Sequence, residues 1–314
     1  MLTNSDLISL KGRRVLITGA NGFIGGHLVD ALDGLGALVT VIDMRPIDGK
    51  ALVREYVGNL CDSDFTETCV KECAPEIIIH LAASKDRSAD IGAFSHAVST
   101  NLTGSINLFA SAMKLKGLKS VVVLGTAEEY GNNPTPFVED MRERPVSAYS
   151  YSKLCVTRLC ETLNSLHGTP FVVLRPTVAY GPWQGPEMFL PALIKTLLEK
   201  KAFPMTPGIQ TRDFVYVDDL INAILSASVS PQAAGQVINI GSGNPVAIAD
   251  IAIKAARLLG REDLLRIGAL DYRCGEAMEY YVNTSKARQL LDWTASFSLD
   301  EGLKRTVEHY QKGL

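Results

Sequence analysis

The sequence predicts an α/β protein with a doubly wound parallel sheet and a smaller α/β lobe. Three observations support this fold. Apolar runs of strand length alternate with helical patterns in the first half, a glycine-rich loop follows the first run, and the second half is less regular. Strand, helix and strand at short spacing favour parallel strands joined by crossover helices. The carboxyl ends of such strands form the edge at which ligands bind.

Five buried strands are predicted in the first half of the chain. They are Val15–Thr18, Leu38–Asp43, Ile77–Ala82, Val121–Gly125 and Phe171–Arg175. The first helix is expected over Ile24–Leu35, because its apolar residues recur at helical spacing. Each strand therefore feeds a helix that returns to the same sheet.

The alternation of strand and helix patterns becomes less regular near Pro176. Proline and glycine cluster in Tyr180–Pro191 and Phe203–Gly208, and helical patterns return at Val217–Ser228, Ala249–Leu259 and Ser285–Leu291. We expect residues 1–175 to form the domain with the large sheet and residues 176–314 to form the smaller lobe. The chain is expected to cross between the two more than once.

Composition restricts the class of protein. With 46% hydrophobic and 21% charged residues in 314, the chain can form a sizeable packed core. A net charge of −3 without a basic stripe argues against a nucleic-acid partner. Apolar runs are too short for a membrane helix and no secretory leader is visible, so we expect a cytoplasmic protein that does not enter membranes.

Cysteines and histidines give no sign of a metal site. The six cysteines include no C-x-x-C pair; Cys69 and Cys73 are four residues apart and Cys155 and Cys160 five apart, both pairs in helical stretches. The five histidines form no H-x-x-x-H pair. We expect reduced cysteines and no bound metal.

The loop after the first strand predicts a Rossmann-type dinucleotide site. It reads Gly19-Ala20-Asn21-Gly22-Phe23-Ile24-Gly25 and leads directly into the first helix. Glycines let the backbone approach a phosphate closely, and the helix N-terminus supplies free N–H groups and partial positive charge. We therefore expect this loop to hold the pyrophosphate of NAD or NADP.

The end of the second strand bears on the choice of cofactor. Asp43 follows Gly19 by 24 residues, where an acid can accept hydrogen bonds from the adenosine ribose hydroxyls and so favours NAD. Arg45 lies two residues further on and could hold a 2′-phosphate, which leaves NADP as the alternative.

One tyrosine has a lysine four residues later: Tyr149 with Lys153. On a helix this spacing places both side chains on one face. A nearby ammonium group lowers the pKa of a phenol from about 10. A phenol prepared in this way can exchange a proton with a hydroxyl group while a hydride moves.

Taken together, these motifs resemble an extended short-chain dehydrogenase/reductase, and most of all its nucleoside-diphosphate-sugar epimerases, dehydratases and 4-keto reductases. The likeness runs from about residue 13 to 293. Its motifs are the glycine loop, His80-Leu81-Ala82-Ala83, Tyr149-Ser150-Tyr151-Ser152-Lys153, Leu174-Arg175-Pro176, Gln210-Thr211-Arg212-Asp213-Phe214 and Asn239-Ile240-Gly241-Ser242-Gly243.

The resemblance implies roles for individual residues. Thr126 would hydrogen-bond the reacting hydroxyl, Tyr149 would be the acid/base, and Lys153 would support Tyr149 and hold the nicotinamide ribose. Further cofactor contacts would come from Asn59, Leu60, Leu81, Ala82 and Ala83. Asn59 stands where the family usually has an aspartate beside the adenine.

On the substrate side, the resemblance implies two arginines for the diphosphate, Arg212 and Arg273. Each guanidinium can bind phosphate oxygens bidentately. Arg87 lies in a stretch that resembles a substrate-side loop. A neutral substrate such as a small carbonyl compound would need no such arginines.

Two departures from the family pattern affect the reaction. Glu128 occupies the place of the dehydratase base, but Ala127 replaces the acid that helps water to leave C6. Val178 stands where relatives commonly have an asparagine that contacts the substrate. The first departure argues against complete 4,6-dehydration, and the second implies looser fixation of the substrate, which is compatible with an epimerase that must let the keto-sugar turn over before the hydride returns.

The resemblance therefore implies an NAD(P)-dependent oxidoreductase acting at C4 of a nucleoside-diphosphate sugar. A 4-epimerase fits best, with a 4-keto reductase or a 4,6-dehydratase as alternatives. A module that binds NAD(P) without catalysis is a more distant alternative, because such relatives usually lose the Tyr or the Lys. Apolar surface on helices near Thr100–Lys114 and Tyr149–Leu166 predicts a homodimer.

Overall fold

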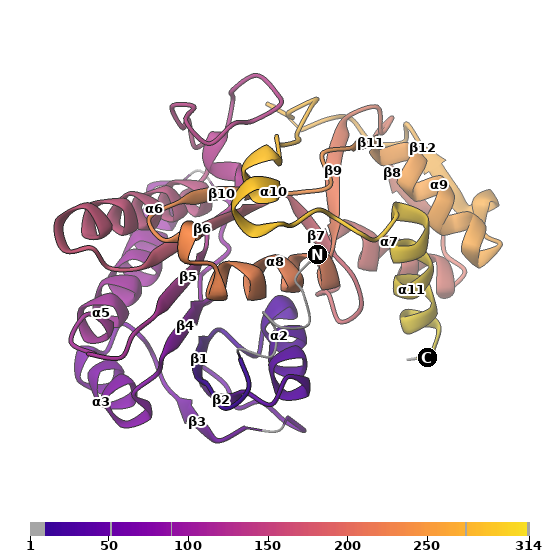
Figure 1. The fold of residues 1–314 in the computed structure, drawn as a ribbon. Helices are drawn as coiled ribbons and strands as arrows, with labels where there is room; N and C mark the ends of the chain where they lie inside the picture. Colours follow the sequence, from indigo (N-terminus) through magenta and orange to yellow (C-terminus); the bar gives the residue numbers. More distant parts are fainter. Residues whose placement is uncertain (1–9, 51, 89, 274, 313–314) are drawn as a thin grey trace.

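The computed structural model describes residues 10–312 except 51, 89 and 274. Its centre is a seven-stranded sheet in the order β10-β6-β5-β4-β1-β2-β3, with every pair parallel (Figure 1). The strands are β1 (Arg14–Thr18), β2 (Leu38–Asp43), β3 (Arg54–Val57), β4 (Ile77–His80), β5 (Ser120–Leu124), β6 (Phe171–Pro176) and β10 (Val237–Ile240). The strand order reverses beside β1, so the loop after β1 lies at the position where such sheets bind ligands.

Helices cover both faces of this sheet, as Figure 1 shows. Helices α2 (Phe23–Gly34) and α8 (Val217–Val229) pack on one face, and α3 (Ser63–Cys73), α5 (Thr103–Ala112) and α6 (Ala148–His167) pack on the other. Side chains alternate along each strand, so Val15 and Ile17 of β1 enter one apolar core while Leu16 enters the second. The sheet is therefore buried on both faces, which explains its continuous apolar runs.

Short connecting elements complete this half. Helix α4 (Ile91–Ala97) continues into a π-helical turn, η1 (Val98–Leu102), ahead of α5, and a 3-10 turn, η2 (Ala127–Tyr130), follows β5. The turns η3 (Pro231–Ala233) and η4 (Glu262–Leu264) are also of the 3-10 type.

The smaller lobe contains two short sheets and helices. Strands β7 (Val178–Tyr180), β9 (Thr211–Tyr216) and β11 (Pro245–Ala247) form one sheet, and β8 (Phe203–Met205) pairs with β12 (Leu265–Ile267). The remaining helices are α7 (Phe189–Leu198), α9 (Ile248–Leu259), α10 (Ser285–Leu291) and α11 (Leu299–Lys312). The predicted doubly wound sheet with a smaller α/β lobe is confirmed.

The chain crosses between the two parts repeatedly. Strand β10 and helix α8 come after residue 176, yet β10 is an edge strand of the large sheet and α8 packs on its face. A single boundary at residue 176 therefore does not divide the chain into the large-sheet domain and the smaller lobe.

All five predicted strands are present, with ends that differ by at most two residues from the prediction. Strand β4 stops at His80 rather than Ala82, because the chain turns there to line the end of the sheet. Strands β3 and β10 were not predicted. β3 is an edge strand of four residues, Arg-Glu-Tyr-Val, whose side chains are half-buried or exposed, so it has no apolar run to detect.

Candidate active site

The glycine loop packs so closely against its neighbours that no side chain fits at Gly19 or at Gly25. Gly19 has a φ of +74°, and a Cβ on it would lie 2.6 Å from the backbone nitrogen of Ala82. A Cβ on Gly25 would lie 2.5 Å from the carbonyl oxygen of Gly19. Gly22 caps helix α2 with its backbone alone. The loop thus presents backbone N–H groups at a helix N-terminus, the arrangement that binds a pyrophosphate.

A cavity of about 520 Å³ opens along this loop and over the carboxyl ends of the central strands. Every residue predicted to contact the cofactor lines it: Gly19, Asn21, Gly22, Phe23, Ile24, Gly25, Asp43, Asn59, Leu60, Leu81, Ala82, Ala83, Tyr149 and Lys153. The lining of this cavity includes both the phosphate-binding loop and the Tyr149–Lys153 pair. The close-packed glycine cradle and this set of residues fit a dinucleotide.

At the ribose end of the cavity, Asp43 is oriented by the backbone. Its carboxylate accepts hydrogen bonds from the amide nitrogens of Asn21 (2.9 Å) and Arg45 (3.2 Å). Asn59 is fixed in a similar way, since its side-chain oxygen accepts from the amide of Cys61. The side chain of Arg45 is exposed at the rim of the same cavity.

Tyr149 and Lys153 project from the first turns of α6 into the cavity. Ser147 caps this helix, accepting a hydrogen bond from the amide of Ser150 at 3.1 Å. Lys153 is 4% exposed, and burial lowers the pKa of its ammonium group to about 8. The sequence predicts a lowered pKa for Tyr149, but in the structure burial raises it, the charge of Glu128 raises it further, and the opposing effect comes from Arg87.

Thr126 meets Tyr149 from the end of strand β5. It is the N-cap residue of η2, where its hydroxyl accepts from the amide of Glu128 at 3.2 Å. The same side chain also lies close to the phenols of Tyr149 and Tyr280, where it opposes the effect of burial on the pKa of each. Tyr280, from the second half of the chain, was missed in the sequence, because no motif there distinguishes it from the neighbouring Tyr281.

Two residues predicted to act on the substrate, Arg87 and Glu128, contact each other. Arg87 donates to both carboxylate oxygens of Glu128, at 2.8, 3.0 and 3.2 Å. Its guanidinium carbon also lies 5.0 Å from the ring centre of Tyr149. Arg87 therefore binds both carboxylate oxygens of Glu128 next to Tyr149.

Arg212 faces the same region from β9. It forms an ion pair with Glu276 and donates to the carbonyl oxygens of Thr211 and Ala277 at 2.8 Å. Its guanidinium carbon lies 6.0 Å from the ring centre of Tyr280. Arg212 is thus adjacent to a tyrosine that contacts Thr126.

Arg273 has a different position. Its side chain is exposed, and its carbonyl oxygen accepts a hydrogen bond from the amide of Glu276. The structure therefore places Arg212 beside the site and leaves Arg273 on the surface next to it.

Two buried polar residues that sequence reasoning had not singled out organise the floor of the cavity. The side chain of Asn101, in the π-helical turn, accepts a hydrogen bond from the amide of Ser84 and donates one to the carbonyl oxygen of Ser84. It also donates to the hydroxyl of Ser152 at 2.8 Å. His80 bonds through its two ring nitrogens to the hydroxyls of Thr18 and Ser105. Burial, followed by the charge of Lys153, lowers the pKa of His80 to about 3, so this histidine is neutral.

Neither a group of metal ligands nor a membrane-spanning helix is present among the described residues. No group of three His, Cys, Asp or Glu residues there is arranged to hold a metal ion. No helix found there has the length and apolar character that a membrane span requires.

With this geometry established, the chain can be compared with known proteins. The model of the NAD dependent epimerase/dehydratase family matches residues 15–241, more than half of the chain, so the protein belongs to this family. It is an extended short-chain dehydrogenase/reductase of the nucleotide-sugar type.

Individual relatives agree in fold but differ in reaction. A UDP-glucuronate 4-epimerase of Thermodesulfobacterium geofontis is 30% identical over 93% of this chain and 94% of its own length. A probable dTDP-glucose 4,6-dehydratase of Sinorhizobium fredii is 28% identical over 95% and 92%. The solved UDP-glucuronic acid 4-epimerase of Bacillus cereus, in complex with UDP-glucuronic acid and NAD, is 28% identical and superposes with a TM-score of 0.86 over 96% and 99%.

Proposed function

We propose that this protein is an NAD-dependent 4-epimerase of a nucleoside-diphosphate sugar. The observation that carries the proposal is that Tyr149, next to Thr126, lines the cavity of the glycine loop together with Lys153. The family is NAD dependent, and its members include enzymes that act at C4 of such sugars. NAD is therefore the cofactor, with Asp43 at its ribose.

The residues of this chain have separate roles in the reaction at C4. Held by the glycine loop and Asp43, NAD would supply the hydride acceptor and donor for C4. Tyr149 takes the proton of the C4 hydroxyl and later gives it back, while the Thr126 hydroxyl hydrogen-bonds the same oxygen. Lys153 keeps a positive charge at the same cavity below a pH of about 8. Return of the hydride to the opposite face of the sugar inverts C4.

Arg212 supplies the contact to the substrate diphosphate. Exchanging the carboxylate of Glu276 for a phosphate oxygen keeps the half-buried guanidinium paired. Because Arg212 lies beside Tyr280, a diphosphate bound there leaves the attached sugar within reach of Thr126 and Tyr149.

The neighbours of Glu128 distinguish epimerisation from dehydration. A 4-keto sugar has an acidic proton at C5, and a free carboxylate nearby could remove it, after which the C6 hydroxyl would leave as water once an acid protonates it. Here Arg87 engages both oxygens of Glu128, and Ala127 has no proton to give to a leaving hydroxyl. This pairing favours return of the hydride over elimination.

The test is a panel of UDP-, GDP-, CDP- and dTDP-sugars, with and without NADH or NADPH, followed by mass spectrometry and NMR. Epimerisation leaves the mass unchanged and inverts C4. A product that has lost water would instead identify a dehydratase, and a gain of two hydrogens would identify a 4-keto reductase.

We also propose a homodimer that works in the cytoplasm. Large apolar side chains are exposed along α4, α5 and α6: Ile91 (85%), Ile106 (45%), Tyr151 (43%) and Leu166 (69%). Such a surface on neighbouring helices suits a second copy of the chain. A single-chain mass by light scattering would refute the dimer. The reduced cysteines at positions 61, 69, 73, 155 and 160 suit a reducing compartment.

A further inference from the structure

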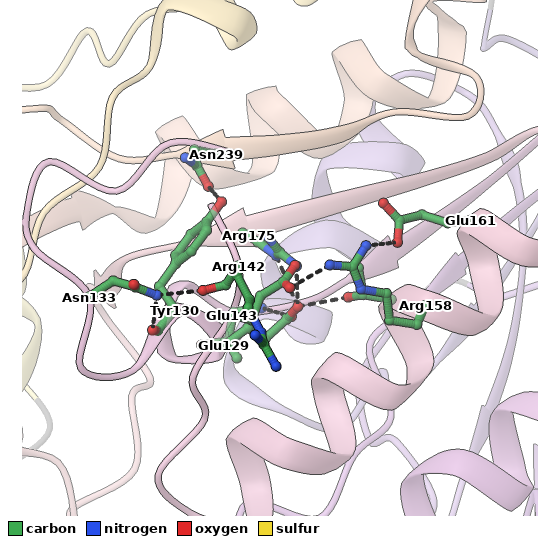
Figure 2. Close-up of polar contacts among 11 residues, drawn as sticks. Glu129, Tyr130, Asn133, Arg142, Glu143, Arg158, Glu161, Arg175 and Asn239 are labelled. Atoms are coloured by element: carbon green, nitrogen blue, oxygen red, sulfur yellow. Dashed lines mark hydrogen bonds and ion pairs between the residues drawn. The ribbon is translucent and has the colours of Figure 1, made fainter. Parts of the chain in front are cut away.

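A buried carboxylate lies directly behind Thr126. Glu129 is 0% exposed, and one of its oxygens accepts the backbone N–H of Thr126 at 2.9 Å. The other oxygen accepts from the hydroxyl of Thr157 and from Nε of Arg175, each at 2.9 Å. Figure 2 shows Glu129 within a cluster that also contains Glu143, Arg158 and Arg175.

The local sequence makes room for this carboxylate. Gly125 ends the turn out of β5, and a Cβ on it would lie 2.7 Å from a carboxylate oxygen of Glu129. Any larger residue at position 125 would push that carboxylate away from Thr126. The space is therefore shaped around an acid at position 129.

Glu129 also reaches the helix that carries the other reacting groups. Tyr149, Lys153 and Thr157 follow one another at intervals of four residues, so they lie in a row along one face of α6. The bond from Thr157 to Glu129 ties this row to the turn that holds Thr126. One carboxylate thereby fixes the spacing between Thr126 and Tyr149.

Arg175 keeps the acid in place without reaching the reacting groups. Its guanidinium lies 2.8 Å from Glu129 and 2.7 Å from Glu143, and Glu143 is paired in turn with Arg158. Glu143 thus belongs to the same cluster as Glu129 but has no contact with Thr126 among those the structure describes. It provides a matched control.

We propose that Glu129 is a positioning residue that holds Thr126 in register with Tyr149 and Lys153 during the reaction at C4. This role rests on the proposed function, since the register matters only if these residues act on a substrate. A glutamate used solely to cap the η2 turn would affect stability and, through its charge, the pH limbs, but it would leave kcat at the pH optimum near the wild-type value.

The charges around the pair define the expected pH response. Tyr149 is influenced by Glu128, Glu129, Arg87 and Tyr280, and Lys153 by Glu129, Cys160, Lys85 and His80. The negative charge of Glu129 raises the pKa of both Tyr149 and Lys153. Its removal lowers both values, so both limbs of the pH–rate profile move to lower pH.

The experiment compares Glu129→Gln with Glu143→Gln on the sugar that the panel identifies. For Glu129→Gln we expect kcat to fall about ten-fold or more with KM within about two-fold, together with the shift to lower pH. Glu143→Gln should keep the wild-type profile. Identical kcat values and pH limbs in the two variants would overturn the proposal.

Thr157→Val and Thr157→Ser provide a second test if Glu129→Gln does not fold. Valine removes the hydroxyl that bonds Glu129, whereas serine keeps it, so kcat should fall several-fold only in the valine variant. Equal kcat values in the two would refute the link through Glu129.

Hydrogen exchange gives a readout that does not need turnover. The amide of Thr126 should exchange faster in Glu129→Gln than in Glu143→Gln or the wild type. A wild type that turns over no sugar in the panel would refute the proposed function, whereas an unchanged Thr126 amide would refute the role of Glu129.

Discussion

Burial and nearby charge set the ionisation of the individual residues at this site. Lys153 and Tyr149 both lie at the cavity, and burial disfavours the charged form of each, so the pKa of the lysine falls while that of the tyrosine rises. Arg87 opposes the rise at Tyr149 because its positive charge lies 5.0 Å from the centre of the phenol ring. The spacing of Tyr149 and Lys153 could be predicted from the sequence, but these shifts depend on neighbours distant in the chain.

At the same scale, His80 predicts a dependence of stability on pH. Its folded pKa of about 3 lies below the ordinary value of 6.5, so between pH 6.5 and 3 the unfolded chain binds a proton that the folded protein excludes. Acidification through this window should lower the free energy of unfolding, by up to about 1.4 kcal/mol per pH unit from this group.

Denaturant unfolding of the wild type and His80→Gln at several pH values between 7 and 4 checks this effect. The variant should lose less stability on acidification. Parallel curves for the two proteins would show that His80 does not contribute.

At the scale of elements, the strand–loop–helix unit formed by β1, the glycine loop and α2 was the part most accessible to prediction. Its apolar strand, its glycines and its amphipathic helix are all local signals. Strand β10 escaped prediction because its place beside β6 depends on pairing between residues more than 60 positions apart. The η2 turn also depends on a distant contact, the one between Glu129 and Arg175.

Two neighbouring glycines of α2 should respond differently to alanine. A Cβ on Gly25 would meet backbone atoms of Gly19 and Ala20 at 2.5 to 2.7 Å, whereas nothing lies within 4 Å of a Cβ on Gly26. Gly25→Ala should therefore cost about 1–3 kcal/mol of stability and weaken NAD binding. Gly26→Ala should be neutral or stabilising by up to about 1 kcal/mol.

Thermal unfolding with and without NAD, together with calorimetric titration of NAD, compares the two variants. Equal behaviour of Gly25→Ala and Gly26→Ala would contradict the close packing of the loop.

At the scale of the whole molecule, the active site is assembled from both parts of the chain. The large sheet provides the cofactor cavity and Thr126, Tyr149 and Lys153, and the second half adds Tyr280 and Arg212. The sequence indicated Arg212 through a motif, but it could not show that Arg87 and Glu128 pair with each other or that Arg273 is exposed. Those arrangements depend on how loops from distant positions meet.

This arrangement predicts that Arg212→Ala weakens the binding of the substrate but not the binding of the cofactor. Loss of one charged contact to the diphosphate should raise KM about 10- to 100-fold, with a smaller change in kcat and unchanged affinity for NAD. Arg266→Ala, an exposed arginine of the same lobe whose side chain bonds only carbonyl oxygens in the described part of the chain, is the control. An unchanged KM in Arg212→Ala would indicate a substrate without a diphosphate.

The most direct test of the account is the 4-epimerisation rate of Tyr149→Phe. Phenylalanine keeps the ring beneath Arg87 and removes only the hydroxyl, so the fold and the affinity for NAD should not change. The rate should fall by about 10²- to 10⁴-fold, the usual contribution of a general acid–base group. A rate close to that of the wild type, with the same inversion at C4, would contradict the assignment of Tyr149 as the group that exchanges the proton.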